Sequence, residues 1–143
     1  MAQVAQYWLS TGQIAGIYEA NTDALVEAQI VPDDPIFGYY KVQTPINAMD
    51  MQHYEIVAGT VQAKAQLTIV ADNPIFPAQG GAKCTVTVEP FVPCTLLANL
   101  VDAYPLTVQQ PTVEMSPGEP KSVRITLQLM AGYWADPIIV TAI

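Results

Sequence analysis

A nine-residue segment in the last quarter of the chain alternates between apolar and polar side chains. In residues 121–129, Val123, Ile125, Leu127 and Leu129 are separated by single serine, arginine, threonine and glutamine residues. Because successive side chains of a β-strand point to opposite faces, this period of two predicts a strand with one buried and one solvated face. We therefore expect the four apolar residues to lie in the core of a β-sheet protein.

Shorter segments of the same kind at residues 83–88 and 104–108 predict two more strands in the second half of the sequence. Further strands are expected at residues 66–70, 95–98, 112–115 and 138–142. Turn-forming groups of Pro, Gly, Asn and Asp separate these segments at intervals of roughly ten residues, which is the spacing typical of a compact β-sandwich of about seven strands. We predict that residues 65–143 form an antiparallel β-sandwich.

The first half has a different pattern. Residues 7–9 and 14–18 predict a hairpin over Thr11-Gly12-Gln13, and residues 22–30 predict a short helix with Asn21 as its N-cap. Further short strands are expected at 37–42, 54–57 and 60–63. Residues 1–64 are therefore predicted to form a small mixed α/β docking module, and the whole chain to be mainly β.

Composition excludes several classes of function. The net charge of −8 repels phosphate backbones, and the sequence has no basic stripe, so we expect no nucleic-acid partner. No apolar run reaches the roughly 18 residues of a membrane-spanning helix, and residues 1–10 lack Lys and Arg, so we expect a soluble, unprocessed chain without membrane insertion. Only 13% of residues are charged, which favours a homo-oligomer or part of a larger assembly, where other subunits cover apolar surface.

The sequence contains no recognisable catalytic or metal-binding motif. His53 is the only histidine, and no nucleophile elbow, phosphate-binding loop or H-E-x-x-H pair accompanies it. The adjacent Asp33 and Asp34 are flanked by prolines, which favours a turn over a glycosidase pair or a calcium site. Cys84 and Cys94 fit two small buried side chains, with a disulfide as the alternative. We predict no enzyme activity, no cofactor and no metal.

Aromatic residues are the remaining candidates for function. Two pairs occur at strand-like positions, where one ring of each pair is expected to face outward and the other to face the core. An outward ring can anchor a protein interface or stack on a sugar, although rings that merely cap the core fit the pattern too. The candidate interface consists of Tyr7, Trp8, Phe37, Tyr39, Tyr40, Tyr133 and Trp134.

The order of these features resembles that of small bacteriophage tail-fibre-like and tail-appendage proteins. Their opening hairpin, Tyr-x-x-x-Thr-Gly-x-Ile, is matched by Tyr7, Thr11, Gly12 and Ile14. Their closing element, Tyr-Tyr-Val-x-x-Gly-x-Val, is matched by Tyr54, Ile56, Val57, Gly59, Thr60 and Val61.

The second half is similar to the Ig-like sandwich that follows in those proteins. Its Pro-x-Pro-Cys-Thr segment is matched by Pro90, Pro93, Cys94 and Thr95, with one extra residue between the prolines. Its final glycine-led hairpin is matched by Gly118, Val123, Ile125, Leu127, Tyr133 and Trp134. The turn at 118–123 and the loop at 105–120 are both longer than the pattern requires.

The resemblance implies a structural virion protein of a phage tail, fibre or appendage that acts as an assembly or adaptor module. It would be assembled in the host cytoplasm and reside in the virion, with other virion proteins as partners. The alternative is an Ig-like module that binds the host surface or the capsid surface, with a host surface glycan as one ligand. A bacterial surface or pilus subunit is disfavoured, because the sequence shows no signal peptide.

Overall fold

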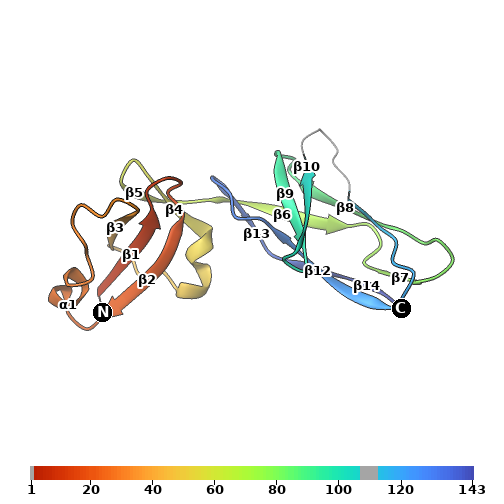
Figure 1. The fold of residues 1–143 in the computed structure, drawn as a ribbon, viewed down its shortest axis with the longest axis horizontal. Coiled ribbons are helices and arrows are strands. Elements are labelled where there is room, and N and C mark those ends of the chain that lie inside the picture. Colours follow the sequence, from red (N-terminus) through yellow and green to blue (C-terminus); the bar gives the residue numbers. More distant parts are fainter. Residues whose placement is uncertain (1, 107–112) are drawn as a thin grey trace. The chain divides into compact units, whose positions relative to one another are not determined.

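The protein is mainly β in the computed structural model, which describes residues 2–106 and 113–143 (Figure 1). The chain divides into two compact units. The first unit runs to Ala65 and also contains Met130–Tyr133, and the second contains Gln66–Leu129 and Trp134–Ile143. The sequence had placed the boundary between residues 64 and 65, and it gave no sign that Met130–Tyr133 belongs with the first unit.

The first unit is built on a three-stranded antiparallel sheet of order β2-β1-β3. The strands are β1 (Ala2–Trp8), β2 (Ile14–Ala20) and β3 (Phe37–Val42). Val4 and Ala5 are neighbours on the central strand and point to opposite faces, yet both are fully buried. The central strand is therefore covered on both sides at this position.

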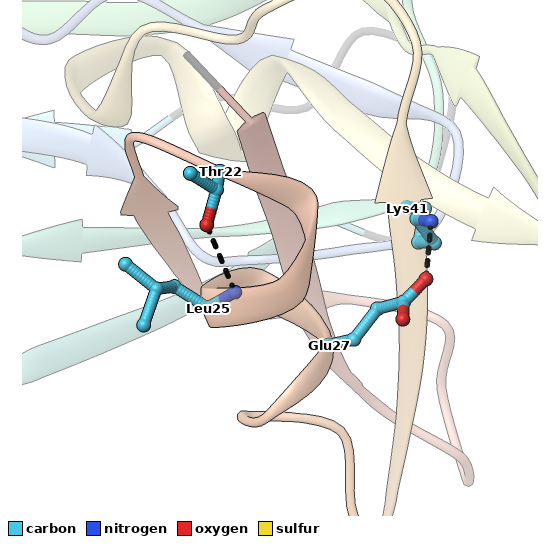
Figure 2. A network of polar contacts seen from close by, with 4 residues as sticks. All are labelled: Thr22, Leu25, Glu27 and Lys41. Carbon is cyan, nitrogen blue, oxygen red and sulfur yellow. Dashed lines mark hydrogen bonds and ion pairs between the residues drawn. The ribbon is translucent and has the colours of Figure 1, made fainter.

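One face of this sheet carries a short helix, α1 (Asp23–Glu27), whose Val26 is buried. The helix is capped by Thr22, whose hydroxyl accepts a hydrogen bond from the Leu25 N–H at 3.3 Å (Figure 2). The prediction of Asn21 as the cap and of a helix over residues 22–30 was therefore wrong. After Glu27 the chain continues with turn-like hydrogen bonds from Gln29 and Ile30 to residues three positions earlier.

On the other face of the sheet, the side-chain amide of Gln3 makes two hydrogen bonds to the backbone of Ile46. It donates to the Ile46 carbonyl at 3.0 Å and accepts from the Ile46 N–H at 2.8 Å. This links the sheet to the segment that leads into a 3₁₀ helix, η1 (Ala48–His53), and the hairpin β4 (Tyr54–Val57) and β5 (Thr60–Ala63). The sequence did not predict η1. Gly12 is required here, because its positive φ and the close approach of the Ile56 carbonyl leave no room for a side chain.

The second unit contains two sheets, as expected of a sandwich-like fold. One has the order β10-β9-β12-β14-β7 and the other β11-β8-β6-β13. The strands are β6 (Ala65–Ala71), β7 (Ile75–Phe76), β8 (Cys84–Glu89), β9 (Cys94–Ala98), β10 (Asp102–Leu106), β11 (Val113–Met115), β12 (Lys121–Leu127), β13 (Tyr133–Ala135) and β14 (Ile138–Ala142).

The order β9-β12-β14 corresponds to the C-F-G sheet of an Ig domain, and β6-β8-β11 to its A-B-E strands. One pair departs from the predicted antiparallel arrangement, because β7 runs parallel to β14. The predicted strands at 104–108 and 112–115 correspond to β10 and β11, and residues 107–112 lie outside the described part of the chain.

The core of the second unit comes from alternate residues of both sheets. Val123 and Ile125 are 4% and 1% exposed, in agreement with their predicted burial. Leu127 is only half-buried, and Leu129 lies beyond the end of β12 with 49% of its surface exposed. The prediction that Leu129 faces the core was therefore wrong, because the strand ends two residues before it.

Candidate binding surface

Three of the predicted interface aromatics lie together on one face of the first unit's sheet. In the antiparallel register, Trp8 is opposite Phe37, and the next pair on the same face is Gln6 opposite Tyr39. The Trp8 and Phe37 rings have their centroids 4.4 Å apart and are tilted by 44°. This separation lies at the short limit of the distances at which aromatic rings attract each other.

Tyr18 joins these residues from the other side of the central strand. It is opposite Val4 on β2, and so it projects from the same face as Gln6 and Trp8. Its hydroxyl donates to the Gln6 side-chain oxygen at 3.2 Å, and the Gln6 amide nitrogen donates to the Tyr39 hydroxyl at 3.2 Å. Gln6 therefore bridges two tyrosines across three strands.

The chain of hydrogen bonds ends on a carboxylate. The Tyr39 hydroxyl donates to one oxygen of Asp34 at 3.3 Å, and the other oxygen accepts the backbone N–H groups of Ile36 and Phe37 at 2.9 and 3.1 Å. These backbone donors, and more weakly Tyr39, hold the pKa of Asp34 below its ordinary value. Asp34 is thus an ionised acceptor at the edge of the aromatic residues.

Much of this face is open to solvent. Trp8 and Tyr18 are 41% and 39% exposed, and the neighbouring Leu9 and Ile36, which are joined by a backbone hydrogen bond, are 51% and 53% exposed. Gly16, opposite Gln6 on β2, has open space where a side chain would project. We call the set Gln6, Trp8, Leu9, Tyr18, Ile36, Phe37 and Tyr39 the aromatic surface.

A groove of about 360 Å³ adjoins this surface where α1 lies beside β2. Tyr18 belongs to both features, and Leu25 of the helix is 56% exposed at the groove. Figure 2 shows the helix tied to β3 by an ion pair between Glu27 and Lys41, whose oxygen and nitrogen are 2.7 Å apart. This ion pair raises the pKa of Lys41 and lowers that of Glu27, so each partner stabilises the charged form of the other.

The other predicted interface residues do not join the aromatic surface. Tyr7 and Tyr40 project from the opposite face of the sheet, where the Tyr7 ring lies against Gly38 so closely that a side chain there would clash. Tyr133 and Trp134 are half-buried on β13. The sequence also missed Gln6 and Tyr18, because only the strand register shows which residues share a face with Trp8.

A second polar cluster in the first unit is buried. Gln13, Glu55 and Lys64 are each no more than 7% exposed. Gln13 accepts a hydrogen bond from the Lys64 ammonium and donates one to Glu55 at 3.2 Å, and Glu55 accepts the Gly132 N–H at 2.9 Å. Burial lowers the pKa of Lys64, and the nearby Glu55 partly opposes that shift. The cluster attaches Gly132 to the rest of the first unit.

The described residues contain no group of three or more His, Cys, Asp or Glu that could hold a metal ion. Cys84 and Cys94 are free thiols on different sheets of the second unit, and burial raises the pKa of both. Asp33, at a positive φ of 59°, and Asp34 lie in the turn before β3. Within the described part of the chain, no helix is long and apolar enough to cross a membrane.

Comparisons of the chain with protein-family models, with curated proteins and with solved structures found no match.

Proposed function

We propose that this chain is a structural virion protein of a bacteriophage tail, fibre or appendage, and that it acts as an assembly or adaptor module. The observation that carries the proposal is the aromatic surface, on which Trp8 and Tyr18 remain about two-fifths exposed beside the exposed Leu9 and Ile36. Exposed clusters of aromatic and aliphatic side chains are typical of sites where proteins dock, because covering them removes apolar area from water.

The surface is organised for binding a protein. Gln6 and Asp34 fix the orientation of Tyr18, Tyr39 and the backbone at Phe37 through hydrogen bonds. Ordering these side chains before a partner arrives reduces the conformational entropy lost on binding. Together with the resemblance of the opening hairpin to tail-appendage proteins, this supports an adaptor assembled in the host cytoplasm and retained in the virion with other virion proteins.

The proposal is tested by following the chain into particles. The chain would be expressed with the rest of its gene cluster, and particles from the lysate would be purified on a density gradient and probed with an antibody. We expect the wild-type chain in the particle fraction, and the Trp8→Ser, Phe37→Ser double variant in the soluble fraction. Val57→Ser is the matched control, because Val57 is 42% exposed in the same unit but lies outside the aromatic surface. A wild-type chain absent from particles contradicts the proposal.

A module that binds a host surface glycan is the second candidate, and the arrangement around Gln6 favours it. Its amide keeps one N–H and one lone pair beyond its bonds to Tyr18 and Tyr39, next to the open space at Gly16. A sugar ring that stacked on Trp8 could meet both groups. Titration with methyl glycosides, followed by tryptophan fluorescence, tests this. Saturable quenching that is lost in Gln6→Leu and retained in Val57→Ser supports it, and no quenching contradicts it.

A further inference from the structure

The second unit has an exposed apolar surface of its own, around the only arginine in the sequence. Arg124 lies on β12 between the buried Val123 and Ile125, so its side chain projects from the outer face of the sheet. Across the strand pair it is opposite Ile139, which is 62% exposed.

On the other side of Arg124 lies the β9–β10 turn. The side chain of Asn99 accepts the Arg124 N–H at 2.9 Å, and the next two residues of that turn, Leu100 and Val101, are 70% and 79% exposed. We call Arg124, Ile139, Leu100 and Val101 the Arg124 surface. It combines a single cation with three exposed aliphatic side chains.

Arg124 has no partner for its charge within the described residues. None of the ion pairs found there involves Arg124, and its hydrogen bond with the Asn99 side chain is made by its backbone N–H, not by its guanidinium. An exposed arginine that lies beside apolar side chains and has no paired carboxylate is suited to an interface, because its planar guanidinium both stacks on aromatic rings and pairs with carboxylates.

The first unit offers the complementary charge. It contains seven Asp and Glu residues but only two lysines, Lys41 and Lys64. Lys41 is paired with Glu27, and Lys64 is buried in the Gln13 cluster. Asp33 and Asp34, beside the aromatic surface, form no ion pair within the described residues. The aromatic surface therefore has unbalanced negative charge at its edge.

We infer that the aromatic surface of one copy docks on the Arg124 surface of a second copy, with the guanidinium of Arg124 against Asp33, Asp34 and the neighbouring rings. Docking two aromatic surfaces on each other is disfavoured, because it would bring four carboxylates together without a cation. Joining the two different surfaces instead covers both apolar clusters and pairs the charges.

A contact between two different surfaces leaves one surface of each kind free at the ends of every complex. Such heterologous contacts propagate into a filament or close into a ring. The inference rests on the proposed assembly role and specifies it, since a ring or stack of identical subunits is one way in which an adaptor occupies a particle. Both surfaces are small, so we expect weak association of the isolated protein.

The first test is sedimentation velocity at protein concentrations up to about 1 mM, in the range where weak interfaces associate. Wild-type protein should show concentration-dependent growth that added NaCl weakens. Arg124→Glu should weaken association by about tenfold or more, as expected for removing one partner of a charge pair. Lys121→Glu is the matched control, because it makes the same charge change at another exposed position on β12. Near-ultraviolet circular dichroism verifies that each variant is folded.

Mixing two variants tests whether the contact joins two different surfaces, the aromatic surface of one copy and the Arg124 surface of another. Trp8→Ser lacks an intact aromatic surface and Arg124→Glu lacks an intact Arg124 surface, so each alone should associate much more weakly than the wild-type protein. Mixed together they retain one intact surface of each kind and should form a dimer that grows no further. In addition, Asp33→Arg should restore association to Arg124→Glu by exchanging the charges.

Three results would overturn the inference: wild-type protein that is monomeric at every concentration, equal effects of Arg124→Glu and Lys121→Glu, and a mixture of the two variants that stays monomeric. These outcomes are separate from the particle experiment. A monomeric wild-type chain that still enters particles refutes self-association alone, whereas a self-associating chain that is absent from particles refutes the virion role alone.

Discussion

The two units of this chain bury their sheets in different ways. In the second unit, two sheets each contribute alternate residues to a shared apolar core, and Leu67, Leu96, Ile125 and Val140 are each 1% exposed. In the first unit, a single three-stranded sheet has its two faces covered by short segments, and several of these are attached through buried polar side chains such as Gln3 and Gln13.

This difference has a consequence for stability and for function. A sandwich core depends on the volume and shape of apolar side chains, whereas the first unit also depends on hydrogen bonds whose loss leaves buried polar groups unsatisfied. Because the small helix α1 leaves part of its face uncovered, the first unit's sheet retains the exposed aromatic surface. The four predictions below test this contrast, in order of decreasing effect.

The largest effect is expected in the buried polar cluster of the first unit. Glu55→Ala removes the acceptor of Gln13 and Gly132 and leaves the buried Lys64 ammonium without its nearby carboxylate, so it should reduce the free energy of unfolding by about 3–5 kcal/mol. Urea unfolding of the first unit can be followed by Trp8 fluorescence in a Trp134→Phe background.

The control for this prediction is the double variant Glu55→Leu, Lys64→Met, which replaces both charges by apolar groups. It should be clearly more stable than Glu55→Ala, because no unpaired charge remains buried. If the single and double variants unfold at the same urea concentration, the cluster does not stabilise the first unit through its charges.

The second prediction concerns the sandwich core. Ile125 is 1% exposed, so Ile125→Ala should cost about 2–5 kcal/mol through lost burial and a residual cavity. Thr126, its neighbour on the opposite face, should tolerate Ala with little loss, since its hydroxyl is buried without a hydrogen-bond partner in the described structure. Trp134 fluorescence in a Trp8→Phe background reports on the second unit. Equal losses at the two positions would show that the alternation along β12 does not reflect burial.

The contrast also explains how far the sequence predicts the fold. Alternation at residues 121–127 and 83–88 predicts strands of the sandwich well, because a half-buried strand requires a period of two. The same reasoning failed at Leu129, since periodicity does not specify where hydrogen bonding to the neighbouring strand ends. Strand β7, with two residues, is too short to produce a pattern at all.

The first unit was harder to predict because local signals there are short. The hairpin turn at Gly12 and the strand β3 were expected, but the first strand begins at Ala2 rather than at residue 7, and the 3₁₀ helix η1 was missed. The attachment of Gly132 depends on residues 77 positions apart in sequence, Glu55 and Gly132. No local pattern contains such a contact.

The candidate surface was predicted in part. Trp8, Phe37 and Tyr39 were selected as aromatic residues in strand-like segments, and the register brings them together. Their partners Gln6 and Tyr18 could not be selected, because a lone glutamine or tyrosine gives no signal until the pairing of β1 with β2 is known. Arg124 was passed over for the same reason, since its exposed apolar neighbours come from other strands and turns.

A third, smaller effect is expected at the cap of α1. Thr22→Ala should cost about 1 kcal/mol in the first unit, because it removes the side-chain acceptor of the Leu25 N–H. Asn21→Ala should cost much less, since the structure assigns the cap to Thr22. Urea unfolding followed by Trp8 distinguishes the two. A larger loss for Asn21→Ala would place the start of the helix one residue earlier.

The smallest effects are expected at two hairpin turns, one in each unit. Both turns hold two successive residues at positive φ, Ala58 and Gly59 between β4 and β5, and Asn99 and Leu100 between β9 and β10. Turns with two successive residues at positive φ favour Asn followed by Gly, because an ordinary side chain at positive φ meets steric strain. The first turn therefore has the favoured Gly at its second position but Ala at its first. The second turn has the favoured Asn at its first position but Leu at its second.

Completing the Asn-Gly pair in each unit should be stabilising. Ala58→Asn in the first unit and Leu100→Gly in the second should each raise the free energy of unfolding by roughly 0.5–1 kcal/mol, as expected when a strained residue at positive φ is relieved. Each substitution should affect only the unit that contains it, which the Trp8 and Trp134 signals can resolve in the same unfolding experiment. A gain of equal size in both signals from either substitution would mean that the two units unfold together, and that their different cores do not give them separate stabilities.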